Sequence, residues 1–592
     1  MLNDFFQKKK FIRYIPSIGW LRTYQRAWLR DDLVSGVVVG MIMIPVAMSY
    51  AQMAGVPPQA GLYSAIVGMA AYALLATSRH MKVTTSSTMS IMSLAVVAPL
   101  AAGDPNALMA LTSALAITVG IILLVLSLLK LGFISDFLAK SVMTGYVFGV
   151  ACLIAVSQLP KVFGVSGGSG SFFQQMGQLI SKLPETNIYS LMLGVGTIVL
   201  VFAIKRYFPL VPGGLIALIL GIVVTTYFDL NALYGVSVVG TIPTGMPVPG
   251  LPNINLDTIP FLIGGAMGIV FLAAGETLGT ARSFAAKYHY EIDSDQELLA
   301  MGAANITSGL FRGITIDMSL SNTASGEDAG ERTQLSSLVS SGLILLVVLF
   351  LAPLLTNLPS AVLGAIVLSS IVGLFNVAEF KRYYFQRRTD FFLALTALIG
   401  VVSSDVMTGL MIAVLLSVVM LLYRASRPYI ATLGRRPGSP GEYGDISRNK
   451  EVELIPGLVI LRLDAPLYFF NANVARTQIL GQTKENPPKA ILLDLGASAD
   501  LDIGTSDMLT ALISDLRQVG IDMFFSQVRS SVRDRMRLTG LLAHIGEDHI
   551  FVSLDSAVKA FEGKDKKKSR KKTLLPKESD APAGQSPDQQ KN

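Results

Sequence analysis

The feature that most constrains this chain is a series of apolar runs, each about as long as a membrane-spanning helix. Stretches such as "LTSALAITVGIILLVLSLL" and "LVSSGLILLVVLFLAPLL" recur between about residues 32 and 427. A helix needs ~20 apolar residues to cross the hydrocarbon core of a bilayer. Only 15% of the 592 residues are charged and the mean hydropathy is +0.54, whereas soluble proteins carry about 25% charge. These runs predict an α-helical, polytopic membrane protein.

The hydropathy pattern also predicts how the chain is divided. About fourteen hydrophobic segments are expected to span the membrane. They lie near 33–52, 60–77, 85–101, 107–130, 135–158, 189–206, 212–228, 258–280, 295–311, 319–331, 334–355, 359–375, 390–404 and 408–425. The predicted parts are a cytoplasmic segment at 1–31, a transmembrane domain at 32–427, a linker at 428–452, a small α/β domain at 453–562 and a basic, disordered tail at 563–592.

The distribution of Lys and Arg predicts the orientation in the membrane. With the N-terminus in the cytoplasm, nearly every basic cluster falls on the cytoplasmic side, and the outer loop from Asp229 to Asp257 contains no Lys or Arg. The exceptions are Lys161, Lys182 and Arg312. The positive-inside rule therefore places both termini in the cytoplasm. The N-terminus has no cleavable signal, so we expect a multi-pass protein of the cytoplasmic (inner) membrane.

Several classes of function are excluded by what the sequence lacks. The single cysteine, Cys152, rules out an internal disulfide and any cysteine-based metal cluster, and the four histidines are scattered. No nucleophile–base pair, P-loop or dinucleotide fingerprint is present. The net charge of +7 is largely explained by the positive-inside pattern. We therefore expect no enzyme, no cofactor, no resident metal and no nucleic-acid partner.

Two clusters of hydroxyl residues begin unusually short hydrophobic segments. Thr84 to Thr88 open "TTSSTMSIMSLAVVAPL", and Ser319 and Ser321 open "SLSNTASGEDAGERTQLS". The first segment enters the membrane from the cytoplasmic side and the second from outside, so the two are inverted counterparts. Non-helical backbone at membrane depth is tolerated only where it lines a cavity. Short, polar-headed segments in matching positions of two halves are the best sequence indication of a transporter's binding site.

The chemistry of such helix starts favours an anion. Each helix N-terminus carries unpaired N–H groups and roughly half a positive charge. Two of them facing each other form an anion site without any cationic side chain, and neutral hydroxyls add donors. The alternative interpretation is that these hydroxyls bond back to their own or a neighbouring helix.

Intramembrane carboxyl groups suggest coupling to a cation. Glu276 lies within the apolar stretch "GIVFLAAGETLGTARS". An ionisable residue inside the membrane is costly to bury and therefore indicates a functional role. Glu276 is expected to bind a proton or, together with Thr280 one turn later, Na⁺; alternatively, it lies at the cytoplasmic interface. Asp317, two residues before Ser319, either joins this cation site or is a helix N-cap.

The motifs around these residues resemble one known family. The stretches "GMIMIPVAMSYAQMAGVPPQAGLYSA" and "ATSRHMKVTTSSTMS" are similar to the sulfate permease (SulP) family, as is "IDMSLSNTASGEDAGERTQLS". The likeness extends from about 12 to 562. It implies two inverted seven-segment repeats, a core domain that moves against a gate domain, a cytoplasmic STAS domain and a homodimer formed through the membrane domain and STAS.

The resemblance also implies a substrate pocket and a cation site. By motif, the pocket would contain Tyr50, Thr85, Ser86, Ser87, Thr88, Ser319, Leu320, Ser321 and Asn322, with Glu276 and Thr280 beside it. Most relatives have Gly-Pro where this chain has Thr84-Thr85, and Arg or Lys where it has Asn322. Without that cation, Glu276 has no obvious positive partner and would repel an anion unless H⁺ or Na⁺ neutralises it. Cation-coupled uptake is therefore favoured over electroneutral exchange.

The C-terminal part alternates predicted strands and helices, which favours a mostly parallel sheet flanked by helices. "GLVILRLDAPLYFF" is expected to form two short strands, with a helix over "ANVARTQILGQ". "RLDAPLYFFNA" and "LDLGASADLDIGTSDML" resemble STAS domains. The hydroxyl that is phosphorylated in related regulators is replaced here by Ile503-Gly504 after Asp502. Thr505 and Ser506 are expected to act as a helix cap, and the domain to have a structural, dimer-supporting role.

Together these observations predict a secondary active transporter for a small anion, with sulfate as the default substrate and H⁺ or Na⁺ as the coupling ion. Family members that carry bicarbonate or C4-dicarboxylates leave those substrates open. A nucleobase permease and a STAS-based sensor remain as alternatives. The basic tail "GKDKKKSRKK" is expected to be disordered or to lie on anionic lipid.

Overall fold

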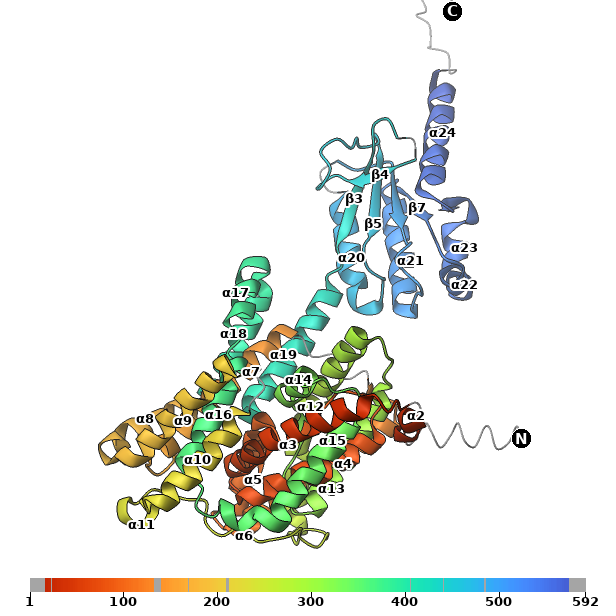
Figure 1. The fold of residues 1–592 in the computed structure, drawn as a ribbon. Helices are drawn as coiled ribbons and strands as arrows, with labels where there is room; N and C mark the ends of the chain where they lie inside the picture. Colours follow the sequence, from red (N-terminus) through yellow and green to blue (C-terminus); the bar gives the residue numbers. More distant parts are fainter. Residues whose placement is uncertain are drawn as a thin grey trace, which may run out of the picture. The chain divides into compact units, whose positions relative to one another are not determined.

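The computed structural model describes residues 16–22, 24–132, 140–168, 170–208, 212–404, 406–439, 441–483 and 486–573. The chain divides into two compact units, Met1–Val418 and Val419–Asn592 (Figure 1). The first is helical and the second contains a six-stranded sheet. The predicted fold class, a polytopic helical protein with a small α/β domain, is confirmed.

Each predicted hydrophobic segment coincides with a helix. These are α3 (Trp28–Met53), α4 (Pro58–Leu75), α5 (Ser87–Ala101), α6 (Pro105–Leu128), α7 (Lys140–Phe163), α9 (Ile188–Tyr207), α10 (Gly213–Tyr227), α12 (Ile259–Tyr288), α13 (Ser294–Leu310), α14 (Leu320–Asp328), α15 (Leu335–Leu346), α16 (Ser360–Ile371), α18 (Arg388–Ser403) and α19 (Val406–Ser426). Within the described residues, eight helices are long and apolar enough to cross a membrane, and α5 and α10 are shorter apolar helices.

Short helices connect these segments. They are α2 (Ser17–Arg22), α8 (Phe172–Lys182), α11 (Leu230–Tyr234) and α17 (Val377–Gln386). After α15 the chain continues through a π-helical turn, Val347–Leu351, and a 3₁₀ turn, Ala352–Leu355. These two turns complete the hydrophobic segment predicted at 334–355.

The membrane helices pack into two sets. In one set, α13 lies against α4 and α6, and α3 against α4 and α15, with α5, α12 and α14 attached. In the other, α7 lies against α9, α16 and α18. The two sets correspond to the expected core and gate domains, and they meet where α3 contacts α10 and α16.

Glycine allows the closest of these helix approaches. A Cβ atom at Gly61 of α4 would lie 1.9 Å from the carbonyl oxygen of Ala47 of α3, and one at Gly145 of α7 would lie 1.9 Å from that of Ala394 of α18. No side chain fits at either contact. Small residues let membrane helices approach backbone to backbone, which supplies packing energy where lipid gives no hydrophobic driving force.

The second unit is a mixed sheet with the strand order β4-β3-β5-β6-β7-β8. The strands β5 to β8 are parallel, and β3 is antiparallel to both β4 and β5. The elements are β3 (Ile430–Arg435), β4 (Tyr443–Asp445), β5 (Leu458–Leu463), α20 (Phe469–Gly481), β6 (Ala490–Asp494), α21 (Ile503–Gln518), β7 (Asp522–Ser526), α22 (Ser530–Leu538), α23 (Leu541–Ile545), β8 (Ile550–Phe551) and α24 (Leu554–Thr573).

Alternating side chains give this sheet a hydrophobic core on each face. Leu461, Leu493 and Phe525 are aligned across β5, β6 and β7 and pack with residues of α20 to α23. Their neighbours Ile460, Leu492 and Phe524 pack with α24 residues on the opposite face. Successive side chains of a strand point to opposite faces, so apolar residues at every position indicate a sheet covered on both sides.

Three local expectations differ from the structure. Two segments of the expected linker, Ile430–Arg435 and Tyr443–Asp445, form β3 and β4 because their apolar side chains complete the sheet. The second strand expected in "LDAPLYFF" is absent, since α20 already begins at Phe469. Helix α24 continues to Thr573, so the start of the tail expected to be disordered is helical. Residues 574–592 lie outside the described residues.

Candidate functional site

The two hydroxyl clusters meet at a short antiparallel ladder inside the membrane unit. Strand β1 (Val83–Thr84) leads into α5, and strand β2 (Asp317–Met318) leads into α14. Val83 pairs with Met318 and Thr84 with Asp317. The ladder therefore brings the N-termini of α5 and α14 together, as the inverted-segment interpretation predicts.

Hydrogen bonds from several helices hold this junction. The Ser319 N–H donates to the Lys82 carbonyl oxygen at 2.9 Å, and the Lys82 N–H donates to the Thr323 hydroxyl at 3.0 Å. Asn305 of α13 bonds both backbone groups of Ile316, at 3.0 and 2.9 Å. These bonds satisfy backbone groups that have no helical partner, which non-helical chain at membrane depth requires.

The start of α5 combines one cap with several available hydroxyls. Ser86 is the N-cap, and its hydroxyl accepts from the Met89 N–H at 3.2 Å. The Thr84 and Thr85 hydroxyls are buried and have no hydrogen-bond partner among the described residues. Ser87 and Thr88 follow in the first turn, and both are largely buried. Unpaired buried hydroxyls are rare in proteins, so this group is suited to a ligand that supplies the missing partners.

The start of α14 has a different cap. Ser319 is the N-cap residue, and the amide of Asn322 donates to its hydroxyl at 2.7 Å. Asn322 is buried, whereas Ser321 and Leu320 are exposed, Leu320 by 58%. Asn322, the residue that departs from the family pattern, therefore orients the hydroxyl of Ser319. The N-cap interpretation of Asp317 is wrong, because Ser319 occupies that position.

Two carboxyl groups lie beside the junction. Helix α12, which carries Glu276, contacts both α5 and β2. Asp317 is fully buried, and neither carboxyl oxygen has a hydrogen-bond partner of normal geometry among the described residues. Glu276 is its electrostatic neighbour, and Tyr50 lies close to Ser87 and Asp317. The structure thus brings Glu276, Asp317 and Tyr50 to the two helix starts.

Not every predicted site residue is tied to this cluster. Thr280 is half-buried one helical turn after Glu276, and no hydrogen bond in the described structure joins it to Asp317. Helix α12 extends to Tyr288, so Glu276 lies within the helix and not at its end.

A buried ion pair that was not predicted from the sequence lies next to the site. Lys82 Nζ lies 2.7 Å from Glu331 Oε2, and both side chains are fully buried. The ammonium group also donates to the hydroxyls of Ser336 and Ser337. Lys82 is thus enclosed by the protein and its charge is paired within the membrane unit. A lysine and a glutamate flanking the two interrupted segments are the sequence signal that could have indicated this pair.

A second buried carboxylate organises the approach to α5. Glu297 of α13 accepts from the backbone N–H groups of Thr77 and Ser78, each at 2.8 Å, and from the hydroxyl of Tyr72. Glu297 therefore accepts hydrogen bonds from backbone N–H groups between α4 and β1, where these groups have no helical partner. Glu297 and the Lys82–Glu331 pair are supports of the junction and do not belong to the predicted pocket.

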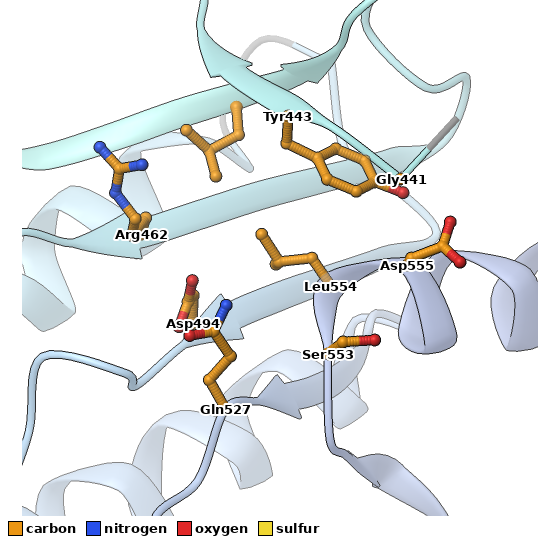
Figure 2. Close-up of a pocket in the computed structure, with 9 residues that line it drawn as sticks. Gly441, Tyr443, Arg462, Asp494, Gln527, Ser553, Leu554 and Asp555 are labelled. Atoms are coloured by element: carbon orange, nitrogen blue, oxygen red, sulfur yellow. The ribbon is translucent and has the colours of Figure 1, made fainter. Parts of the chain in front are cut away.

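The α/β unit has its own cavity, of about 380 Å³, at the carboxyl ends of its parallel strands. Figure 2 shows Asp494 and Gln527 near one another at the strand ends, whereas Asp555 of α24 lies beside Gly441 and Tyr443. Burial raises the pKa of the Asp494 carboxyl. Arg462 is held by Asp464, with Nε and Oδ1 2.6 Å apart, so its charge is already partnered.

The start of α21 shows why a phosphorylation switch is not expected here. Asp502 is the N-cap and accepts from the Thr505 N–H at 2.7 Å, while its other oxygen accepts from the Phe469 N–H. The expected cap role therefore falls to Asp502. Thr505 and Ser506 are buried in the helix, at 0% and 1% exposure. Neither hydroxyl is accessible to a kinase in this fold.

Two models of known protein families match the chain, one in each part of the sequence. The model of the sulfate permease family matches residues 29–397. The chain belongs to the sulfate permease family. A STAS domain model matches residues 449–557, which confirms the predicted domain. This protein is therefore a multi-pass membrane transporter and not an enzyme.

Individual relatives extend over nearly the whole chain. A probable sulfate transporter of Mycobacterium tuberculosis is 36% identical over 93% of this chain and 98% of its own length. A probable sulfate transporter of Arabidopsis thaliana is 28% identical over 94% and 90%. The murine solute carrier 26 family member A9 anion transporter, in its inward-facing state, has the same fold, with a TM-score of 0.86 and 22% identity over 94% of this chain and 95% of that one.

Proposed function

We propose that this protein is a secondary active transporter that carries a small oxyanion together with a cation, and that sulfate is the first candidate substrate. The observation that carries the proposal is the β1–β2 ladder, which holds the N-termini of α5 and α14 at one place. Two of the named relatives are probable sulfate transporters, which supports sulfate as the first substrate to test.

The anion is held by dipoles and hydroxyls. The first turns of α5 and α14 supply partial positive charge and free N–H groups. Hydroxyls then complete the shell: Thr85, Ser86, Ser87 and Thr88 from one side, Ser319 and Ser321 from the other, with Tyr50, Leu320 and Asn322 at the edges. Because none of these residues is cationic, binding depends on neutral donors and the anion is released easily.

The carboxyl pair makes this site depend on a cation. Glu276 and Asp317 interact electrostatically, and no Lys or Arg of the described structure forms an ion pair with either. Two neighbouring carboxylates without a counter-charge disfavour ionisation of both and repel an anion. A proton shared by the pair removes this repulsion. We therefore propose H⁺ as the coupling ion, bound before the anion and released after it.

A second candidate ion is Na⁺. The Thr84 and Thr85 hydroxyls are buried without partners beside Asp317. Hydroxyl and carboxylate oxygens are ligands for hard cations, and Thr280 lies one turn from Glu276. A Na⁺ ion at these oxygens would neutralise the site as a proton does.

The orientation proposed from the basic residues places both termini in the cytoplasm, with the protein in the cytoplasmic membrane. Anion access then alternates when the core set, including α3, α5, α12 and α14, moves against the gate set, including α7 and α16. A homodimer formed through the membrane unit and the STAS domain is part of the same proposal.

The test is uptake of labelled sulfate into proteoliposomes with an imposed inward H⁺ or Na⁺ gradient. We expect accumulation with the wild type and loss of gradient-driven accumulation with Glu276→Gln. Glu291→Gln, on the segment after α12, is the matched control and should transport normally. Absence of sulfate uptake by the wild type rejects sulfate; the same assay with bicarbonate, fumarate and uracil then identifies the substrate class.

A further inference from the structure

Lys161 departs from the charge pattern of the chain. It lies near the end of α7, on the side of the membrane that the positive-inside pattern leaves almost free of Lys and Arg. Its Nζ donates to Gln52 Oε1 of α3 at 3.0 Å. Within the described structure it has no carboxylate at ion-pair distance. An ammonium group has three donors, so Lys161 retains donors for another partner.

Lys161 lines a cavity of about 230 Å³. The lining residues are Gln52, Lys161, Gly164, Val165, Ser190, Ser237, Ser360 and Ala361. None of them carries a carboxylate, and three offer a hydroxyl group. The composition of one cation and several neutral donors is that of an anion site, and it is separate from the Glu276–Asp317 site, none of whose residues line this cavity.

A helix start adds to the positive potential of this cavity. Helix α16 begins at Ser360 without a side-chain cap, and the Ser360 N–H donates to the Ser237 carbonyl oxygen at 2.8 Å. The first turn of α16 therefore faces the cavity with its positive dipole end. Ser190, in the first turn of α9, contributes a hydroxyl from a second helix start.

The cavity lies where the two helix sets meet. Gln52 is on α3 of the core set, whereas Lys161 and Ser360 are on α7 and α16 of the gate set. Gln52 is also two residues from Tyr50, which lies at the central site. A ligand bound to Lys161 thus contacts an element that reaches the junction of α5 and α14.

We propose that the Lys161 cavity is a second anion site, at the outer mouth of the transporter, that takes a small oxyanion such as sulfate before the anion reaches the central site. The nature of the anion rests on the proposed function. Because the cavity joins both helix sets, an anion there links α3 to α7 and α16 in the conformation described here.

The test uses sulfate as the probe and a single reporter cysteine in full-length protein. Cys152→Ser/Ser237→Cys places the reporter in the exposed Ser237 position of the lining. Labelling by a membrane-impermeant maleimide is measured in proteoliposomes with external sulfate or with isethionate at equal ionic strength. Occupancy of the cavity should slow labelling at least about fivefold at saturating sulfate. We expect this protection to vanish in Lys161→Gln and to persist in Lys161→Arg.

The same labelling in Glu276→Gln separates this inference from the proposed function. In this variant sulfate should still slow the labelling of the reporter cysteine although gradient-driven uptake is lost, because Glu276 does not line the cavity. If sulfate fails to slow labelling of the parent protein, or slows it equally in Lys161→Gln, the inference is wrong, whatever the uptake assay gives. If Lys161→Gln does not fold, Ser190→Ala/Ser360→Ala decides: weakened protection supports the site and full protection contradicts it.

Discussion

Thr84 and Asp317 lie directly opposite each other in the antiparallel ladder between β1 and β2. Directly opposed residues of such a ladder have their side chains on the same face, about 5 Å apart. The hydroxyl that precedes one interrupted helix and the carboxyl that precedes the other are therefore held as neighbours. Both groups are buried, and the Thr84 hydroxyl has no hydrogen-bond partner among the described residues. This pairing places a buried carboxyl group at the anion site that we propose.

Removing the Thr85 hydroxyl should weaken anion binding. We expect Thr85→Val to raise the KM for sulfate by roughly tenfold. This change corresponds to the loss of one hydrogen bond to a charged group, which contributes about 1.5 kcal/mol of binding free energy. Ser90→Ala is the matched control, because its hydroxyl already bonds the Ser86 carbonyl oxygen at 2.7 Å. Initial rates of sulfate uptake measure both. Equal KM values for the two variants would contradict a role of Thr85 in the pocket.

Introducing a cation at position 322 should uncouple transport. Asn322→Arg restores the residue type that the sulfate permease pattern has there, so the fold is expected to accommodate it. A permanent positive charge in the first turn of α14, close to Ser319, would favour the ionised forms of Asp317 and Glu276 and replace the coupling ion. We expect sulfate exchange to continue while its dependence on the cation gradient disappears. Retention of full gradient dependence would show that Asn322 does not determine coupling.

The buried pair Lys82–Glu331 should be important for stability. Lys82→Met leaves Glu331 as an uncompensated buried carboxylate, and removal of one partner of such a pair costs about 3–5 kcal/mol. The double variant Lys82→Met/Glu331→Met should recover much of this loss. Thermal unfolding in detergent, followed by size-exclusion chromatography, compares the variants. A double variant no more stable than Lys82→Met would contradict this account of the pair.

The α/β unit should become less stable as pH rises because of Asp494. Burial raises the pKa of this carboxyl, so its favourable contribution is present at low pH and is lost as the pH rises through the folded-state pKa. Asp494→Asn should therefore have a higher free energy of unfolding than the wild type at pH 7.5. This difference in stability should become smaller toward pH 4. Hydrogen exchange of peptides spanning β6 in the full-length protein measures this difference. A gap that stays constant with pH would exclude Asp494 as its source.

The sequence predicted the helical segments and the meeting of two helix starts because hydropathy and inverted spacing are local properties. The likeness to the family placed Glu276 beside the proposed anion site, and Asp317 was considered there because it lies two residues before Ser319. The sequence could not show that Thr84 faces Asp317, since register depends on the paired strands, nor that Lys82 reaches Glu331 across the junction. It also assigned β3 and β4 to a linker, because a Gly- and Pro-rich composition hides strands whose partners lie far along the chain.

The central claim is that Glu276 and Asp317 bind the coupling ion, and simultaneous recording of sulfate entry and internal pH in proteoliposomes tests it most directly. Addition of external sulfate to wild-type vesicles should acidify the interior as sulfate enters. Asp317→Asn should admit sulfate by exchange without this acidification. Acidification unchanged in both Asp317→Asn and Glu276→Gln would contradict the account, as would sulfate entry in the wild type that moves neither H⁺ nor Na⁺.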